Sequence, residues 1–289
     1  MMERGGTMNT IVVTGATSGI GFAVCEALLD AGYQVIGVGR SAENCEKAKA
    51  SLETRRPGTQ VCFFAADLMQ QREVLRVADE IESIIRGSDS GKLHALVNNA
   101  GCVRSRYMTT EEGYEQQFAL NYLSGFLLTH RFMPLIRRDN AAVLFTSSGS
   151  HKMMRVNWDD LMYQKRYRPL YAYKQSKLCN MLFAFNLRGM GVRACGVDPG
   201  LVRTDIGNKN TSGAVNFAWK LRKKHGVPPS LPAMIYTSLC ENGFTGLYYG
   251  SGAKERRTSA YVNEGNARRL YNISLKLCGI NEELWEAPL

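Results

Sequence analysis

Short, strongly apolar runs alternate with longer stretches of mixed hydrophobic and polar residues along most of the chain. The short runs have the composition of buried strands and occupy residues 10–14, 34–39, 60–65, 93–97, 142–146 and 192–197. The longer stretches show helical spacing and occupy residues 22–31, 42–54, 72–85, 111–138 and a segment around 171–177. Alternation of this kind implies right-handed crossovers and a parallel sheet covered on both faces. The pattern therefore predicts a three-layer, doubly wound α/β fold with a parallel sheet of about seven strands.

A glycine-rich turn directly follows the first predicted strand. It reads Gly15-Ala16-Thr17-Ser18-Gly19-Ile20-Gly21, and the helical pattern begins after it. Glycines let the backbone approach a ligand closely, and the amides and dipole at a helix start favour a phosphate. The spacing differs from the usual G-x-G-x-x-G of dinucleotide sites. We expect a pyrophosphate site here, and a glycine-rich turn without a ligand is the alternative.

The second predicted strand ends in Gly39-Arg40 rather than in an acidic residue. Dinucleotide sites of this kind use Asp or Glu at this place to bind the ribose 2′-hydroxyl, whereas arginine accommodates a 2′-phosphate. The sequence thus favours NADP(H) as the cofactor. The alternative is a solvent-facing arginine at a strand end.

Tyr173 and Lys177 stand four residues apart and share one face if their segment is helical. A tyrosine has an ordinary pKa of about 10, and a nearby lysine lowers that pKa because it favours the phenolate. The pair is therefore a candidate acid/base device. A surface pair without a chemical role is the alternative, and the motifs upstream favour the chemical role.

Composition indicates one large cytoplasmic domain. The chain has 289 residues, of which 45% are hydrophobic, and this is enough for a full core. Its eight cysteines show no metal-like spacing, so we expect reduced thiols and no metal site. No apolar run is long enough to cross a bilayer, and Met1–Asn9 lacks the apolar core of a signal peptide.

The net charge of +10 is concentrated in short basic groups at residues 165–168, 220–224, 254–257 and 268–269. Such groups can attract nucleic acid, anionic lipid or a phosphorylated ligand. No nucleic-acid-binding motif accompanies them. We expect ordinary solvated helix faces and no nucleic-acid partner.

Further motifs occur in a fixed order after the glycine-rich turn. They are Asn98-Asn99-Ala100-Gly101, Asn121, Ser148, Tyr173 with Lys177, and the segment from Pro199 to Thr204. With these motifs, residues 10–280 resemble the classical short-chain dehydrogenase/reductase family. Within the family the chain is similar to the retinol-dehydrogenase-like and protochlorophyllide-reductase-like group. The long interval from Ser148 to Tyr173, the residues 158–161 inside it and the segment 267–280 carry that second resemblance.

The resemblance implies a Rossmann-type fold and an NADP(H)-dependent oxidoreductase that interconverts a carbonyl and an alcohol. Tyr173 would exchange a proton with the substrate oxygen, and Ser148 would hydrogen-bond the same oxygen. Lys177 would lower the tyrosine pKa and hold the nicotinamide ribose. Asn121 would hold a water that links Lys177 to solvent. Ser147 lies next to Ser148, and the spacing of the group favours Ser148.

The resemblance also implies the cofactor contacts. The glycine-rich turn would hold the pyrophosphate and Arg40 the 2′-phosphate. The remaining contacts would be Asp67 and Leu68 with the adenine, Asn99, Ala100 and Gly101 with the adenosine ribose, and Pro199, Val202 and Thr204 with the nicotinamide amide.

The expected organisation is an N-terminal tail at residues 1–9 and a single domain at residues 10–289 with a substrate lid at about 205–232. The substrate pocket would be formed by residues 150–169, 205–232 and the C-terminal segment. These stretches contain many apolar and aromatic residues, namely Met153, Met154, Trp158, Met162, Tyr167, Phe217, Trp219 and Leu221. They favour a lipophilic small-molecule substrate such as a retinoid, a steroid or a long-chain aldehyde. Ordinary packing of a lid onto the core is the alternative.

Two other functions remain open at this point. A reductase of a conjugated carbon–carbon double bond would use the same tyrosine and lysine. A non-catalytic NADP(H)-sensing module would keep the glycine-rich turn without needing the catalytic residues. A homodimer is the expected assembly if the Tyr173 helix forms a subunit interface, but the segment 177–192 is shorter than in the retinol-dehydrogenase group, which leaves the oligomeric state open.

Overall fold

The computed structural model describes residues 9–87, 91–203 and 226–281, and the structural statements below concern these residues. Most of the N-terminal tail, the predicted cofactor contact Thr204 and most of the predicted lid lie outside them. The lid residues outside include Phe217, Trp219 and Leu221.

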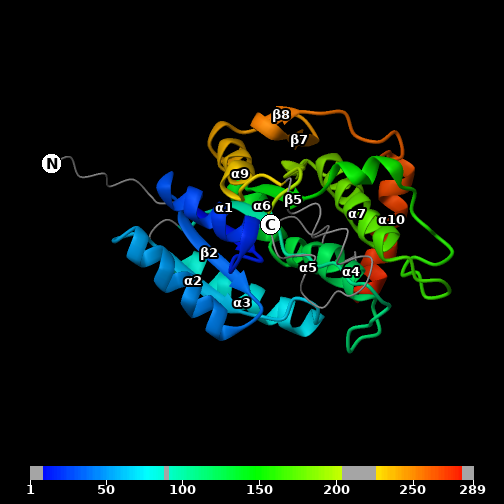
Figure 1. Ribbon diagram of the computed structural model, residues 1–289, viewed down its shortest axis with the longest axis horizontal. Coiled ribbons are helices and arrows are strands. Elements are labelled where there is room, and N and C mark those ends of the chain that lie inside the picture. The colour runs from blue at the N-terminus through cyan, green and yellow to red at the C-terminus, as the bar shows by residue number, and fades with distance from the viewer. Residues whose placement is uncertain (1–8, 88–90, 204–225, 282–289) are drawn as a thin grey trace.

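An eight-stranded sheet with the order β3-β2-β1-β4-β5-β6-β7-β8 runs through the centre of the molecule (Figure 1). Neighbouring strands are parallel except for β7 and β8. The strand order changes direction between β1 and β4, and ligands bind outside the carboxyl ends of the strands at such a point. The strands are β1 (Thr10–Thr14), β2 (Gln34–Gly39), β3 (Val61–Ala65), β4 (Leu93–Asn98), β5 (Ala142–Thr146), β6 (Ala194–Val197), β7 (Tyr248–Gly250) and β8 (Lys254–Glu255).

Two hydrophobic clusters fill the spaces on the two faces of the sheet. Ile11 and Val13 contribute to one cluster and Val12 to the other, as expected from the alternation of side chains along a strand. The first face is covered by α1 (Gly19–Asp30), α2 (Ala42–Arg55) and α9 (Ser230–Asn242). The second face is covered by α3 (Gln71–Gly87), α5 (Ser124–Arg131), α6 (Met133–Asp139), α7 (Pro169–Gly189) and α10 (Glu264–Leu277). The predicted three-layer α/β fold is confirmed.

The prediction of one continuous helix over residues 111–138 is wrong. The structure instead has α4 (Gln116–Phe118), a π-helical segment η1 (Ala119–Leu123), α5 and α6. Pro134 stands in the first turn of α6 and has no N–H group to continue a helix from α5. The wider π turn places Asn121 inside the interrupted region, and π turns of this kind occur often at functional sites.

Helix α10 lies beside α7 and covers it (Figure 1). The Tyr271 ring of α10 lies 5.7 Å from Phe126 and 6.4 Å from Phe183, measured between ring centroids. Tyr122 and Ser274 are joined by a hydrogen bond of 2.7 Å between their hydroxyl groups. Between the sheet and α10, every residue of α7 from position 175 to position 184 is buried.

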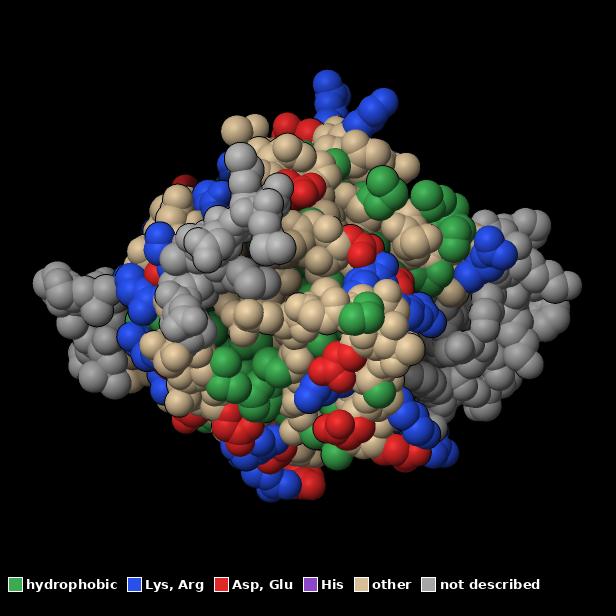
Figure 2. Space-filling view, turned by 90° about the vertical axis from the view of Figure 1, so that its left-hand side faces the viewer, with side chains coloured by type: hydrophobic (Ala, Val, Ile, Leu, Met, Phe, Trp, Pro, Cys, Tyr) green, Lys and Arg blue, Asp and Glu red, His purple; other side chains and the backbone are tan. Residues whose placement is uncertain are grey.

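Several of the basic side chains have partners within the protein. Arg269 stacks on Trp158 at 4.4 Å from the ring centroid, Arg168 lies over Tyr171, and Arg256 is 3.5 Å from a carboxylate oxygen of Asp198. On the face seen in Figure 2, basic and acidic side chains are interspersed and the hydrophobic ones form small separate groups.

Among the described residues, no helix is both long and apolar enough to span a membrane.

Candidate active site

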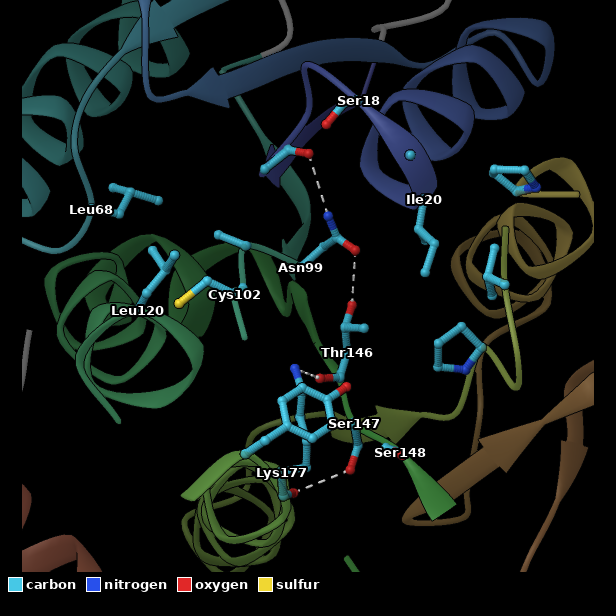
Figure 3. A pocket seen from close by; sticks show the side chains of 18 of the residues that line it. Ser18, Ile20, Leu68, Asn99, Cys102, Leu120, Thr146, Ser147, Ser148 and Lys177 are labelled. Atoms are coloured by element: carbon cyan, nitrogen blue, oxygen red, sulfur yellow. Dashed lines mark hydrogen bonds between the residues drawn. The ribbon is translucent and has the colours of Figure 1, made fainter. Parts of the chain in front are cut away.

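A cavity of about 890 Å³ opens at the carboxyl ends of the parallel strands (Figure 3). This volume is typical of small-molecule and cofactor sites. It brings together most of the predicted site residues, namely Gly15, Thr17, Ser18, Gly19, Ile20, Arg40, Asp67, Leu68, Asn99, Ala100, Gly101, Ser148, Tyr173, Lys177, Pro199 and Val202. Gly21 and Asn121 do not line the cavity, and Thr204 lies outside the described residues.

The glycine-rich turn is tight enough that two of its glycines cannot carry a side chain. Gly15 has a φ of +66°, and a Cβ atom on it would lie 2.9 Å from the Cα of Ala100. A Cβ on Gly21 would lie 2.2 Å from the carbonyl oxygen of Gly15. The turn leads into α1, whose first amides have no partner within the helix, and the Ser18 side chain does not cap them. Gly19 and Ile20 line the cavity, and amides at such a helix start fit the negative charge of a pyrophosphate.

Asn99 joins three strand ends through its side chain. Its Nδ2 donates to the carbonyl oxygen of Thr14 at 2.9 Å. Its Oδ1 accepts from the Thr146 hydroxyl at 3.2 Å (Figure 3). The carboxamide is thus used within the sheet. A contact of Asn99 with a ribose would involve the second lone pair of Oδ1 or the main chain of this residue.

Arg40 stands at the end of β2 and is exposed at the rim of the cavity. Its guanidinium makes no hydrogen bond or ion pair with any residue that the structure describes. Gly39 before it has no room for a side chain, because a Cβ there would lie 2.3 Å from Cγ2 of Thr17. The strand end therefore presents a free cation and no carboxylate, which fits a 2′-phosphate.

Lys177 is almost completely buried, and its Nζ donates to the carbonyl oxygen of Thr146 at 2.9 Å. The same Nζ lies 5.6 Å from the centroid of the Tyr173 ring, one turn earlier on α7. Burial lowers the pKa of Lys177 to about 8, because the interior disfavours the charged form. The phenol and the amine thus face the cavity together, as their spacing in the sequence predicts.

Ser147 and Ser148 have different environments. Ser147 is buried and its hydroxyl donates to the carbonyl oxygen of Lys177 at 3.1 Å, so this side chain anchors α7 to the sheet (Figure 3). Ser148 accepts hydrogen bonds from both the N–H and the hydroxyl of Ser150, at 3.3 and 3.0 Å. Its own hydroxyl proton is then left for an acceptor in the cavity. This geometry supports Ser148 as the residue that would meet a substrate oxygen.

Asn121 uses both hydrogens of its carboxamide inside the protein. Nδ2 donates to the carbonyl oxygen of Cys102 and to the hydroxyl of Ser176, each at 3.0 Å, and Oδ1 accepts from the N–H of Cys102 at 2.7 Å. The residue therefore fixes the loop after β4 to α7. A water bound here would have to be held by an oxygen of Asn121.

Several residues that line the cavity were not found from the sequence. Among them are Cys102, Arg104, Leu120 and Thr146. Thr146 could have been predicted to line the cavity, because it stands at the carboxyl end of a predicted strand. Arg104 follows Gly101 closely and its Nε donates to Oε1 of Gln116 at 2.6 Å. Nothing in the sequence distinguishes Leu120 from its helical neighbours.

The apolar segment after β5 contributes less to the cavity than predicted. Met153 lines it and is 70% exposed. Met154 is buried in the core, Trp158 and Met162 pack against the core, and the Tyr167 hydroxyl donates to Glu115 at 2.7 Å. The C-terminal segment was also expected here, and its described part packs on α7 instead of lining the cavity. For Met154, Trp158 and Met162, packing onto the core is what the structure shows.

The sheet order, the glycine-rich turn and the cavity beside it define a doubly wound, dinucleotide-binding class of protein. Residues 9–163 match the family described as short chain dehydrogenase. The chain belongs to this family, which confirms the resemblance seen in its motifs.

Individual relatives support the same group within the family. The chain is 31% identical to retinol dehydrogenase 12 of Mus musculus, over 96% of this chain and 87% of the relative. It is 29% identical to polyprenol dehydrogenase of Homo sapiens, over 93% of this chain and 84% of the relative. The similarity to the retinol-dehydrogenase-like group is thus confirmed.

Solved structures support the fold. The crystal structure of the NADPH-dependent 3-quinuclidinone reductase from Rhodotorula rubra matches with a TM-score of 0.64 and 22% sequence identity. The match covers 84% of this chain and 89% of that chain.

Proposed function

We propose that this protein is an NADP(H)-dependent oxidoreductase that interconverts a carbonyl and an alcohol on a lipophilic small molecule. The observation that carries the proposal is the single cavity that joins the glycine-rich turn at one end to Ser148, Tyr173 and Lys177 at the other. Membership of the short chain dehydrogenase family supports an oxidoreductase.

The chemistry follows from the positions of the side chains. The bound nicotinamide would supply or accept hydride at the substrate carbon. Tyr173 would give the substrate oxygen its proton during reduction, and Ser148 would hydrogen-bond that oxygen and so hold the carbonyl in place. Lys177, charged below its pKa of about 8, would favour the phenolate and bind the nicotinamide ribose.

The preference for NADP(H) rests on Arg40. Its free guanidinium at the end of β2 would pair with a 2′-phosphate, and Gly39 offers no acceptor for a 2′-hydroxyl. The amides at the start of α1 would hold the pyrophosphate, and Asp67 and Leu68 would border the adenine. The 3-quinuclidinone reductase of similar fold is described as NADPH-dependent, which is compatible with this choice.

The lipophilic substrate class rests on the apolar rim of the cavity. Met153, Leu170 and Leu201 line this rim and are each partly or largely exposed. Relatives described as retinol and polyprenol dehydrogenases suggest the same class for this chain. We therefore propose retinoids and other long-chain or polycyclic carbonyl compounds as the first substrates to assay.

The proposal is tested by following NADPH oxidation with a panel of such carbonyl compounds. Tyr173→Phe keeps the ring and the packing, and it should lower kcat by about 10²-fold or more while NADPH affinity stays nearly unchanged. Tyr171→Phe is the matched control, because Tyr171 is an exposed tyrosine on the same helix and does not line the cavity. Wild-type kcat in Tyr173→Phe would contradict the proposal.

Ser148 and Lys177 complete this test. Ser148→Ala should lower kcat by about 10²-fold with little change in cofactor binding, and Lys177→Ala should lower both. Mass spectrometry of the product distinguishes an alcohol from a saturated compound with its carbonyl intact. The second product would instead identify a reductase of a carbon–carbon double bond.

Other features of the proposal come from the sequence. We propose a single catalytic domain at residues 10–289, with the stretch 205–232 closing over the substrate. All eight cysteines are free thiols, which supports a reducing, cytoplasmic location. A homodimer stays a prediction. Fractionation of cells tests the cytoplasmic location, and light scattering of the purified protein tests the homodimer.

A further inference from the structure

The main chain of Ser148 is hydrogen-bonded by a short turn that has no role in the proposed chemistry. The turn is the 3₁₀ helix η2 (Gly149–Met153), and it carries His151, whose side chain is completely buried. The carbonyl oxygen of Ser148 accepts two hydrogen bonds from this one residue. The N–H of His151 donates at 3.1 Å and Nδ1 of its ring lies at 2.7 Å.

These contacts fix the form of the His151 ring. A carbonyl oxygen only accepts, so Nδ1 carries the hydrogen. Burial lowers the pKa of His151 and keeps the ring neutral, so Nε2 has a free lone pair. That lone pair faces the Thr258 hydroxyl at 3.1 Å, and the hydroxyl donates to it. His151 therefore links the backbone of Ser148 to a segment that follows β8.

The same turn rests on a second buried polar group. A Cβ on Gly149 would lie 3.1 Å from Oδ2 of Asp198, so the turn and this carboxylate are in close contact. Asp198 accepts hydrogen bonds from the Tyr248 hydroxyl at 2.9 Å and from the N–H of Gly200 at 3.0 Å. The His151 ring packs edge-on against Tyr248, with the centroids 4.8 Å apart.

We propose that His151 is a positioning residue for Ser148, acting through its Nδ1–H bond to the Ser148 carbonyl and anchored by Thr258. The inference rests on the proposed function, because it gives Ser148 the task of holding the substrate oxygen. A hydroxyl that must meet this oxygen within a few tenths of an ångström needs a fixed backbone, and catalytic geometry of this kind depends on supporting hydrogen bonds. The substrate end of the cavity is thus tied to the β7–β8 edge of the sheet.

The test compares variants of His151 that keep or remove the bond to Ser148. His151→Asn can place an amide N–H where Nδ1 lies and should keep kcat within about threefold of wild type. His151→Phe removes the donor and should lower kcat by about tenfold or more, with NADPH affinity within about twofold of wild type. The matched control is His94→Phe. His94 also bonds a backbone carbonyl, that of Cys240 at 2.9 Å, but it lies at the other end of its strand and does not line the cavity.

A double-mutant cycle shows whether His151 acts through Ser148. In the Ser148→Ala background, His151→Phe should lower kcat by less than about twofold, because the hydroxyl that it positions is already absent. An equal loss in both backgrounds would overturn the inference, since His151 would then support the site as a whole. If His151→Phe fails to fold, His151→Gln replaces it, because a glutamine amide reaches Thr258 but not the Ser148 carbonyl. Equal kcat values in the Asn and Gln variants would then reject the inference.

The outcomes also separate this inference from the proposed function. A large loss in Tyr173→Phe and Ser148→Ala with full activity in His151→Phe would remove only the role of His151. Full activity in Tyr173→Phe and Ser148→Ala would remove the proposed function and the role of His151 with it.

Discussion

The two ends of the cavity are built in different ways. At the dinucleotide end, the glycine-rich turn brings main chain close to the cavity, and at glycines such as Gly15 and Gly39 neighbouring atoms occupy the place that a Cβ would take. At the substrate end, His151, which bonds the Ser148 carbonyl, and Asp198 are held by side chains from distant segments. Thr258 is 107 residues away from His151, and Tyr248 is 50 residues away from Asp198.

This difference explains which end can be recognised from the sequence. A main-chain site concentrates its requirements in a few adjacent glycines and so leaves a local pattern. A site held by side-chain hydrogen bonds depends on residues that meet only after folding. Substitutions should therefore affect cofactor affinity at the first end and catalytic rate at the second.

The largest effect is expected from Gly21→Ala at the dinucleotide end. The added Cβ would lie 2.2 Å from the Gly15 carbonyl oxygen and 2.5 Å from Nδ2 of Asn99, so the turn has to move. We expect NADPH affinity to fall by about 100-fold or more, as measured by calorimetry. Gly189→Ala is the control, because a Cβ there meets nothing within 4 Å. Unchanged affinity in Gly21→Ala would show that the turn does not hold the cofactor.

Arg40 should determine the choice between the two nicotinamide cofactors. Wild-type protein should bind NADPH at least tenfold tighter than NADH, a difference of about 1.4 kcal/mol, because only NADPH carries the 2′-phosphate. Arg40→Ala should remove most of this preference. Arg55→Ala serves as the control, since Arg55 pairs with Glu26 and does not line the cavity. Equal wild-type affinities for both cofactors, by titration calorimetry, would refute the assignment.

Lys177 should make cofactor binding depend on pH, because its proposed partners are both the nicotinamide ribose and the Tyr173 phenol. Its pKa of about 8 in the free protein means that the charge is lost above this pH, so NADPH affinity should fall by about fivefold between pH 7 and pH 9. Binding to Lys177→Met should be weaker and should lack this dependence. A wild-type affinity that stays constant over this range would contradict the expectation.

The same lysine should affect stability with the opposite sign. Between its folded pKa of about 8 and the ordinary value of 10.5, the unfolded chain binds more protons than the folded one. The contribution of Lys177 to the free energy of unfolding should therefore rise with pH across this window, by at most about 1.4 kcal/mol per pH unit. Urea unfolding of wild type and Lys177→Met at several pH values measures the difference.

The smallest effect is expected from Tyr248→Phe at the substrate end. The change removes the hydrogen bond to Asp198 and should lower the free energy of unfolding by about 1 kcal/mol. It should lower kcat by about threefold and leave NADPH affinity unchanged. Tyr249→Phe is the matched control, because its buried hydroxyl accepts from the N–H of Gly246 and not from the site. A similar loss of kcat in both variants would remove the contrast between the two ends.

The sequence predicts the sheet better than the helices between its strands. The run at 10–14 matches β1 because five consecutive buried residues leave an unambiguous apolar pattern. The long helix at 111–138 was wrong, since the apolar spacing does not reveal the π turn at Ala119–Leu123. Trp158 was expected in the substrate pocket and packs on the core, because an apolar side chain in a loop fits either place.

In the candidate site, too, the sequence predicts local contacts better than contacts between distant segments. Local spacing is enough to bring Tyr173 and Lys177 together on α7, and to place the glycine-rich turn at the start of α1. The choice between Ser147 and Ser148 follows in the structure from the bond of Ser147 to α7. No spacing marks His151, whose partner Thr258 comes from another part of the chain.

The cover that α10 places over α7 has a consequence for the order of folding. Phe126 and Phe183 lie in the middle of the chain, yet Tyr271, which packs against both, belongs to one of the last elements described. During synthesis these two rings would stay open to water until the residues of α10 have emerged from the ribosome. Nascent chains that halt after β8 but before residue 264 would therefore expose an aromatic surface to chaperones and to each other, even though every strand of the sheet has already been synthesised.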